Sequence, residues 1–444
     1  MMMQTARHKL VARNLAAALL SGVWSAEEMA GQLEGVLGRA TRKSQRRLVA
    51  AIFAGHDAAY PPAPAALAKT ILAARSFERA AGRQLRGSGP LRMVLRSPRF
   101  APVLPIAGFD VVALPTSGDV AEWLGLPIEQ IDWFTDARRQ HGRTAIPILQ
   151  HYTYAFRAKR AGPPRLIEAP KPRLKTIQRR ILRGILDRVP AHAAAHGFVA
   201  GRSCRSSAEL HVGAAVVVCL DIADFFVTTP LGRVHALFRS LGYPDAAARV
   251  LTGLCSTVTP ESVFNRLSNP ARHTREAYRI YREPHLPQGA PSSPALANLV
   301  AWRLDVRLTG LAKAYGARYS RYADDLAFSG DTDFAAKARS LIDAVAVIVE
   351  DEGYTLNGRK TRIMTPAQRQ QVTGIVVNRH LNIARDSYDA LKATLHNCRR
   401  HGLDAENRDG HADFRAHLEG RIGWVQSINP ERANRLRAIF DAIP

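Results

Sequence analysis

The sequence predicts an α+β protein in which an N-terminal helical region precedes a core of strands and helices. The chain has 444 residues, more than one ordinary domain, so we expect two or three structural units. Hydrophobic residues make up 46% of the chain, which excludes a mostly disordered protein. Residues 1–58 show helical patterns, whereas from about residue 150 short apolar runs alternate with helical stretches.

Cysteine usage and hydropathy favour a cytoplasmic protein. The four cysteines never form a Cys-x-x-Cys pair, which argues against a disulfide scaffold and a Cys-rich zinc site. No run of 18 apolar residues occurs, so we expect no membrane span and no membrane partner. The apolar run Leu15–Leu20 is too short for the core of a signal peptide, and Arg13 adjoins it.

The charge balance favours a nucleic-acid partner. Lys and Arg number 62 against 38 Asp and Glu, a formal net charge of +24. A generally basic protein with solvated arginines is the alternative, but here the charge is clustered. Between residues 157 and 188, only Glu168 and Asp187 oppose a run of basic residues. These are Arg157, Lys159, Arg160, Arg165, Lys171, Arg173, Lys175, Arg179, Arg180, Arg183 and Arg188.

Helix signals organise the N-terminal region. Ser25 and Glu28 have the spacing of a capping box and predict a helix start. The proline-rich segment 60–64 predicts a break, followed by a helix over 65–84 and a turn over 86–90.

Two short helices are predicted around Gly125, over residues 119–126 and 128–134. A DNA-reading helix-turn-helix has this spacing, but such pairs are more often packing units. We therefore favour a packing role.

Strand signals begin in the second part of the chain. Val216–Leu220 is apolar on both faces and predicts a central strand. Ser293-Pro294 predicts the start of one long helix over 294–315. Residues 318–328 predict two strands joined at Ala323-Asp324. The remaining expected elements are helices over 334–350 and 387–400, two helices within 412–443, and a strand over 371–378.

Three carboxylates occupy positions where strands end. Asp221 follows the apolar strand, and Asp324 and Asp325 lie at the tip of the expected hairpin. Carboxylates at the ends of adjacent strands can converge on two hard cations that activate a hydroxyl and stabilise departing pyrophosphate. Ordinary turn chemistry is the alternative for each Asp taken alone.

The sequence around these aspartates resembles a known enzyme family. Residues 218–226, 286–294 and 322–325 resemble motifs A, B and C of reverse transcriptases, and more specifically of the bacterial retron-type enzymes. Further similar segments occur in the same order along about residues 118–440. They are 165–171 with 174–178, 196–203, 356–361, 372–378 and 420–430.

The resemblance implies a right-hand polymerase with fingers, an antiparallel palm sheet and a thumb. Residues 116–378 would form fingers and palm, residues 379–444 a helical thumb, and residues 1–115 a helical extension that the resemblance leaves unexplained. The implied reaction is RNA-directed DNA synthesis with two Mg²⁺ ions, for which Mn²⁺ could substitute. The implied partners are a structured non-coding RNA, its cDNA product, dNTPs and an effector protein, in bacterial defence against phage.

The resemblance also implies metal and nucleotide ligands. Asp221, Asp324, Asp325 and the carbonyl of Ile222 would bind the metal ions. The expected dNTP site adds several residues to this set. They are the amides of Asp224 and Phe225, the steric gate Phe226, Gln288 and Gly289 of the Pro-Gln-Gly turn, Arg165, Lys159, and Lys360 as general acid for pyrophosphate.

RNA contacts are expected from three places, of which His211 is one. Val372-Thr373-Gly374 agrees with the tripeptide by which retron enzymes engage their RNA, and the basic cluster contributes Lys171, Arg173 and Lys175. A second retron signature, Asn-Ala-x-x-His, is matched by Ala208 and His211, but Ser207 replaces the Asn.

Other interpretations remain open. The chain could be a reverse transcriptase of another bacterial defence lineage, including one that synthesises without a template, or a non-catalytic RNA-binding scaffold on the same fold. A zinc cluster could also be drawn from His192, His196, Cys204 and His211, but its spacing matches no closed zinc module.

Overall fold

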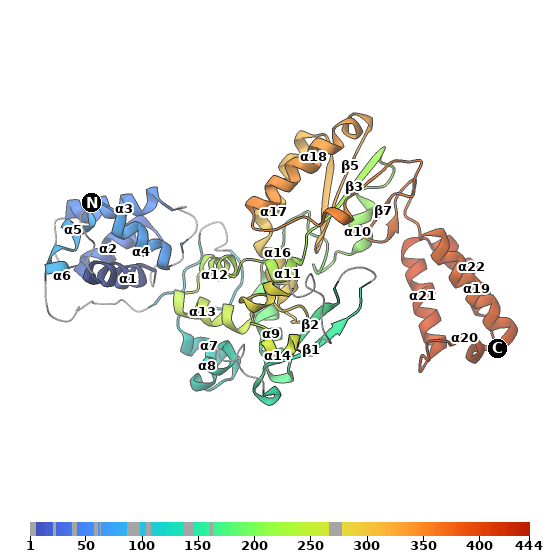
Figure 1. Cartoon of the computed structure of the whole chain (residues 1–444), viewed down its shortest axis with the longest axis horizontal. Helices are drawn as coiled ribbons and strands as arrows, with labels where there is room; N and C mark the ends of the chain where they lie inside the picture. The colour runs from blue at the N-terminus through green and yellow to red at the C-terminus, as the bar shows by residue number, and fades with distance from the viewer. Residues whose placement is uncertain are drawn as a thin grey trace. The chain divides into compact units, whose positions relative to one another are not determined.

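The computed structural model divides the chain into two compact units. It describes residues 6–20, 24–37, 42–56, 61–62, 64–86, 98–103, 108–136, 146–159, 163–265 and 278–444. Unit 1 comprises residues 1–190 and 226–300, and unit 2 comprises residues 191–225 and 301–444 (Figure 1). The boundaries expected at residues 115 and 378 stay predictions. Most of the turn expected over 86–90 lies outside the described residues.

Unit 1 begins with a bundle of six helices, drawn in blue in Figure 1. Their apolar faces share one core that includes Leu15, Met29, Leu48 and Ile71. One bond of the predicted capping box is present, since the Ser25 hydroxyl accepts a bond from the Glu28 N–H at 3.2 Å. The single helix predicted over 65–84 is three short helices. The bundle consists of α1 (Ala6–Leu20), α2 (Ala26–Leu37), α3 (Arg42–Ala54), α4 (Pro64–Ala73), α5 (Phe77–Ala80) and α6 (Gly82–Arg86).

The rest of unit 1 is a two-stranded antiparallel sheet with short helices. The predicted helix pair around Gly125 is confirmed, and Gly125 ends the first helix with a left-handed φ of 68°. The elements are α7 (Ser117–Leu124), α8 (Ile128–Thr135), η3 (Pro147–Leu149), β1 (Tyr152–Arg157), β2 (Arg165–Pro170), α9 (Pro172–Gly184), η4 (Leu186–Arg188), α12 (Leu231–Ser240), α13 (Asp245–Leu254), α14 (Glu261–Phe264), η5 (Arg279–Arg282) and α16 (Ser293–Val300).

Unit 2 is built on a four-stranded antiparallel sheet with strand order β4-β5-β3-β6. The strands are β3 (Val216–Asp221), β4 (Arg318–Tyr322), β5 (Asp325–Gly330) and β6 (Arg362–Met364). Every residue of β3 is buried, so the predicted central strand is confirmed. The antiparallel sheet amid helices also confirms the predicted α+β class.

Helices cover both faces of this sheet. Helix α18 (Thr332–Asp351) packs on β3 and β5, and α17 (Trp302–Ala314) packs on α18 and β4. The other face shares a core with the C-terminal helices, in which Val217, Cys219 and Ala327 take part. The remaining elements of this part are α10 (Cys204–Glu209), η6 (Gly358–Lys360), α19 (Arg385–His401), α20 (Leu403–Glu406), α21 (Phe414–Ile428) and α22 (Pro430–Phe440). Helix α11 (Phe225–Thr228) begins at the last residue of this segment of unit 2 and continues into unit 1.

Two further sequence predictions are wrong in detail. The helix predicted over 294–315 is two helices, α16 and α17, because Ala301 adopts φ −75° and ψ 2° at the edge of the helical region. The strand predicted over 371–378 is a hairpin of β7 (Gln371–Val372) and β8 (Ile375–Val376). Its turn residues, Thr373 and Gly374, have φ of 48° and 85°, as a two-residue turn between paired strands requires.

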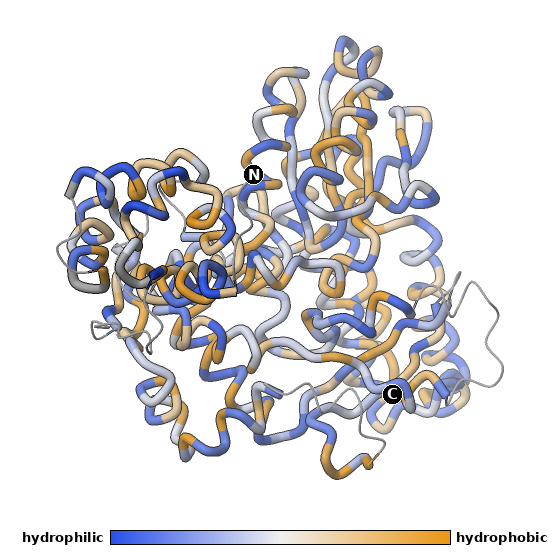
Figure 2. The backbone as a smooth tube through the Cα atoms, turned by 60° about the vertical axis from the view of Figure 1, so that its left-hand side comes forward, coloured by the Kyte–Doolittle hydropathy of each residue, from blue (hydrophilic) through white to orange (hydrophobic). Residues whose placement is uncertain are grey.

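Hydrophobic and hydrophilic residues alternate along the helices (Figure 2), as expected for helices with one face in a core. Among the described residues, no helix is long and apolar enough to cross a membrane.

Candidate active site

The strand register brings three aspartates to one end of the sheet of unit 2. Asp221 ends β3 and pairs directly with Asp325, the first residue of β5. The Ile222 N–H donates to the Asp324 carbonyl at 2.9 Å, so the chain just after β3 stays beside the β4–β5 turn. All three side chains come from segments joined by backbone hydrogen bonds.

The β4–β5 turn has a tight backbone that its neighbours hold in place. Ala323 adopts a left-handed φ of 56°. A strap of residues 194–197 runs along β4, since the Arg321 N–H donates to the Ala194 carbonyl and the His196 N–H donates to the Arg321 carbonyl, both at 2.7 Å. A Cβ at Gly197 would lie 2.6 Å from the Ala323 nitrogen, so only glycine permits this close approach.

Electrostatics at this end of the sheet reflect crowded negative charge. Burial among protein groups, together with the charges of Asp324 and Asp221, raises the pKa of Asp325 to about 6 although part of the side chain reaches solvent. The Lys360 ammonium lies 2.7 Å from Asp221 Oδ2. Burial lowers the pKa of Lys360, but the bond to Asp221 and the charges of all three aspartates outweigh that effect and raise it.

The donor set suits a hard divalent cation, because carboxylate oxygens are the ligands that such ions prefer and the crowded charge would be relieved by one. Within the described ranges, no three His, Cys, Asp or Glu side chains are arranged to hold a metal ion as they stand. The ammonium of Lys360 instead provides the positive charge next to Asp221.

A buried arginine contacts the backbone of the β4–β5 turn, called here the aspartate turn because it carries Asp324. Arg321 is fully buried, and its guanidinium makes two bonds to Asp305, Nε to Oδ1 at 2.8 Å and Nη2 to Oδ2 at 2.6 Å. Its Nη1 donates to the Ala323 carbonyl at 3.1 Å, and its guanidinium carbon lies 5.5 Å from the Phe225 ring centre. Burial opposes the charge, but Asp305 keeps the pKa of Arg321 raised. No sequence pattern predicted this pair.

The motif A segment after Asp221 separates into core and exposed positions. Phe225 is buried and its ring lies 5.5 Å from that of Tyr354, so it belongs to the core. Asp224 is exposed with a left-handed φ of 47°, and Phe226 is half-buried in α11. The expected steric gate is therefore the more accessible of the two phenylalanines.

The remaining dNTP candidates lie in unit 1. Arg165 begins β2 and is exposed, and Lys159 follows β1 and is also exposed. The Gln288 carbonyl accepts a bond from the Glu168 N–H at 2.9 Å. Gly289 has φ 140°, and a Cβ there would lie 2.8 Å from the Glu168 carbonyl. The Pro-Gln-Gly turn therefore packs directly on β2.

A second buried ion pair, which no sequence pattern predicted, lies where the Pro-Gln-Gly turn contacts β2 in unit 1. Glu168 is fully buried, and it accepts bonds from the Thr259 hydroxyl at 2.6 Å and from His285 Nε2 at 2.8 Å. Burial lowers the pKa of His285, but the charge and bond of Glu168 and the carbonyl of Glu283 outweigh it and raise the pKa. The one signal in the sequence was a single glutamate inside a basic run.

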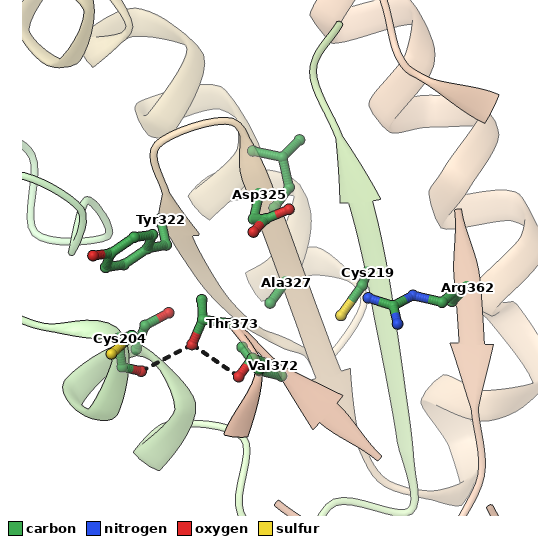
Figure 3. Close-up of a pocket in the computed structure, with 11 residues that line it drawn as sticks. Cys204, Cys219, Tyr322, Asp325, Ala327, Arg362, Val372 and Thr373 are labelled. Atoms are coloured by element: carbon green, nitrogen blue, oxygen red, sulfur yellow. Dashed lines mark hydrogen bonds between the residues drawn. The ribbon is translucent and has the colours of Figure 1, made fainter. Parts of the chain in front are cut away.

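A cavity of 330 Å³ lies beside Asp325 in unit 2 (Figure 3). Figure 3 shows Tyr322 and Asp325 at one side of it and the β7–β8 turn at another. The Thr373 hydroxyl donates to the Cys204 carbonyl at 3.0 Å, which ties the turn to α10. Its lining consists of Cys204, Ser207, Cys219, Tyr322, Asp325, Leu326, Ala327, Arg362, Val372, Thr373 and Gly374.

The structure does not place His211 where RNA could touch it. The side chain is fully buried, and its two ring nitrogens bond the hydroxyls of Ser329 and Ser320 at 2.7 and 2.8 Å. Burial, with the charge of Arg318, lowers the pKa of His211 to about 3. Ser207 bonds the same Ser320 hydroxyl at 2.9 Å. His211 therefore holds α10 against the sheet.

The expected RNA-binding residues of α9 partly serve the fold of unit 1. Lys171 Nζ donates to the Pro147 carbonyl at 2.7 Å, and Arg173 lies over the Phe134 ring at 5.5 Å. Arg173 and Lys175 are exposed.

Comparison with known proteins identifies the family of this chain. The family model described as "Reverse transcriptase (RNA-dependent DNA polymerase)" matches residues 157–379. The chain is 39% identical over 332 residues to the Retron Mx65 reverse transcriptase of Myxococcus xanthus, covering 74% of this chain and 72% of that protein. It is 36% identical to the Retron Mx162 reverse transcriptase of the same organism, covering 73% and 66%. It is 32% identical to the Retron Ec86 reverse transcriptase of Escherichia coli, covering 64% and 81%.

The chain therefore belongs to the reverse transcriptase family, the RNA-directed DNA polymerases. Among its members, the chain groups with the retron-type enzymes.

Proposed function

We propose that this enzyme copies a structured RNA into DNA with two Mg²⁺ ions held by Asp221, Asp324 and Asp325. The register that pairs Asp221 with Asp325 carries this proposal, because it aligns the three carboxylates along one strand end. The raised pKa of Asp325 supports it, since crowded carboxylates are a mark of cation sites. The sheet of unit 2 then corresponds to a palm, β1 and β2 to fingers, and α19–α22 to a thumb.

The ions would supply Lewis-acid activation of the primer hydroxyl and charge stabilisation for the leaving pyrophosphate. The protein residues have separate tasks. Asp221, Asp324, Asp325 and the carbonyl of Ile222 would hold the ions, and Lys360, which contacts Asp221, would donate a proton to the leaving pyrophosphate.

The nucleotide contacts divide between the two parts of the chain. We assign Arg165 and Lys159 to the triphosphate and Gln288 with Gly289 to the sugar and base. Phe226 would exclude a 2′-hydroxyl. The Val372–Gly374 turn with Lys171, Arg173 and Lys175 would contact the RNA. A branched RNA–DNA product and a role in phage defence stay predictions.

The substitution Asp324→Asn tests this assignment. It should abolish primer extension on an RNA template while leaving RNA affinity within about twofold, because it removes one cation ligand at nearly constant shape. Asp333→Asn, an exposed carboxylate on α18 of the same unit, is the matched control and should extend at the parent rate. Chelation of Mg²⁺ should stop the parent enzyme, and Mn²⁺ should restore it. Parent-level extension by Asp324→Asn would refute the metal assignment.

A further inference from the structure

The N-terminal helical bundle contains a basic cavity that the proposed function does not use. It has a volume of 440 Å³ and lies between α3 and the segment that leads into α5. Its lining consists of Ser44, Arg47, Ala51, Arg75, Ser76 and Arg79.

Three guanidinium groups share this cavity, and none of the described residues that line it is acidic. Arg47, Arg75 and Arg79 are exposed, and none of them forms an ion pair within the part of the chain that the structure describes. Glu78 is adjacent to Arg79 in the chain, but its carboxylate lies 3.9 Å from His8. Like charges that line one cavity repel each other, so an anion bound between them would be stabilised.

The Ser76 hydroxyl adds a hydrogen-bond donor to the cavity. Ser76 stands at the N-cap of α5, yet its side chain makes no capping bond. Ser44 is 9% exposed at the cavity wall. Guanidinium forks together with hydroxyls are the donor set that binds phosphate oxygens.

We propose that this cavity binds phosphate groups of the RNA backbone, an inference that rests on the proposed function. Residues 1–86 contain thirteen Lys and Arg against five Asp and Glu, so the region attracts a polyanion. None of the described lining residues is aromatic, so they offer no platform on which a base of a free nucleotide could stack. Successive backbone phosphates can neutralise three guanidiniums at once, without reading sequence.

Two triple variants of the full chain test the proposal. The cavity variant combines Arg47→Gln, Arg75→Gln and Arg79→Gln. The control combines Arg13→Gln, Arg46→Gln and Lys69→Gln, exposed residues of the same bundle outside the lining, so both variants lose the same charge. Binding of a labelled RNA hairpin is measured over a series of salt concentrations, and melting temperatures check that both variants fold.

The cavity variant should bind the hairpin at least about tenfold more weakly, and its slope of log K against log salt should fall by about two, as expected when three phosphate contacts are lost. The control should stay within about twofold of the parent. Equal affinities of the two variants for the RNA hairpin would overturn the proposal. The same result is expected if the cavity binds an acidic protein and not RNA.

Extension of a DNA-primed short RNA template separates this inference from the proposed function. The cavity variant should retain the parent KM for dNTPs, since the cavity is not the nucleotide site. A raised KM with normal hairpin binding would overturn the RNA assignment in favour of a free nucleotide. Failure of the parent enzyme to extend the primer would refute the proposed function. The hairpin-binding measurement would still test the cavity, because it does not depend on DNA synthesis.

Discussion

Two buried ion pairs, one in each unit, support the two sets of residues assigned to the reaction, and they differ in one respect. In unit 2, Arg321 and Asp305 lie below the turn that carries Asp324, with both side chains fully buried. In unit 1, His285 and Glu168 lie at the contact between β2 and the Gln288 turn, also fully buried. A guanidinium keeps its charge at every accessible pH, whereas an imidazole can release its proton. The aspartate turn therefore has permanent support, and the Gln288 turn has support that depends on pH.

The largest expected effect comes from Asp305→Asn. The change leaves the buried Arg321 charge without a counterion, and since the guanidinium cannot lose its proton, we expect a loss of about 3–5 kcal/mol in the free energy of unfolding. Chemical denaturation measures this loss. Asp343→Asn, an exposed acid on α18, is the control and should change stability by less than about 0.5 kcal/mol. Equal stabilities of the two variants would show that the buried pair does not hold this turn.

Glu168→Gln should lower the free energy of unfolding by less, about 1–3 kcal/mol, because His285 can become neutral when its partner loses its charge. The pH dependence is the sharper observable. The folded pKa of His285 is raised above its ordinary 6.5, so the pair stabilises fully below pH 6.5, and this contribution is lost as pH rises through the folded value. The groups that face His285 are Glu168, the Glu283 carbonyl and the Tyr281 ring.

Denaturation curves over a pH series therefore separate the two pairs. The difference in stability between the parent and Glu168→Gln should shrink as pH rises above 6.5, whereas the difference between the parent and Asp305→Asn should stay constant. Glu283→Gln controls for the loss of a nearby exposed charge. A constant difference for Glu168→Gln would contradict the titration of His285 in the folded protein.

Sequence patterns located the aspartates but could not locate these pairs. Asp221 follows an apolar run that local periodicity marks as a strand, Asp324 lies at the tip of an expected hairpin, and the motif order added their roles. Glu168 and His285 are 117 residues apart, and periodicity carries no information about which distant residues meet. Arg321 lies within a strand, where a charged residue ordinarily predicts a solvent-exposed position.

The β7–β8 hairpin shows a different kind of limit. Apolar residues on both sides of Thr373-Gly374 predicted one continuous strand, because the run was judged by its composition. The glycine was the available signal for a turn, since Thr373-Gly374 reverses the chain through two left-handed residues. Such a turn is stabilised by contacts that only the folded chain provides, here the bond from Thr373 to the Cys204 carbonyl of α10.

The smallest effect on stability is expected for a third ion pair, Lys360–Asp221. Its distance of 2.7 Å lies between the 2.6 Å and 2.8 Å of the two buried pairs, so the three pairs differ in exposure and not in length. The Lys360 side chain is 54% exposed, so water competes for its charge, and Lys360→Met should cost no more than about 1 kcal/mol in denaturation. Primer extension should nevertheless slow by about a hundredfold or more, the usual loss when a general acid is removed. Arg359→Met, the exposed neighbour in η6, controls for charge near the site and should leave both quantities close to the parent values. A stability loss as large as that of Asp305→Asn, with extension unchanged, would mean that Lys360 has the structural role of Arg321 and not a catalytic one.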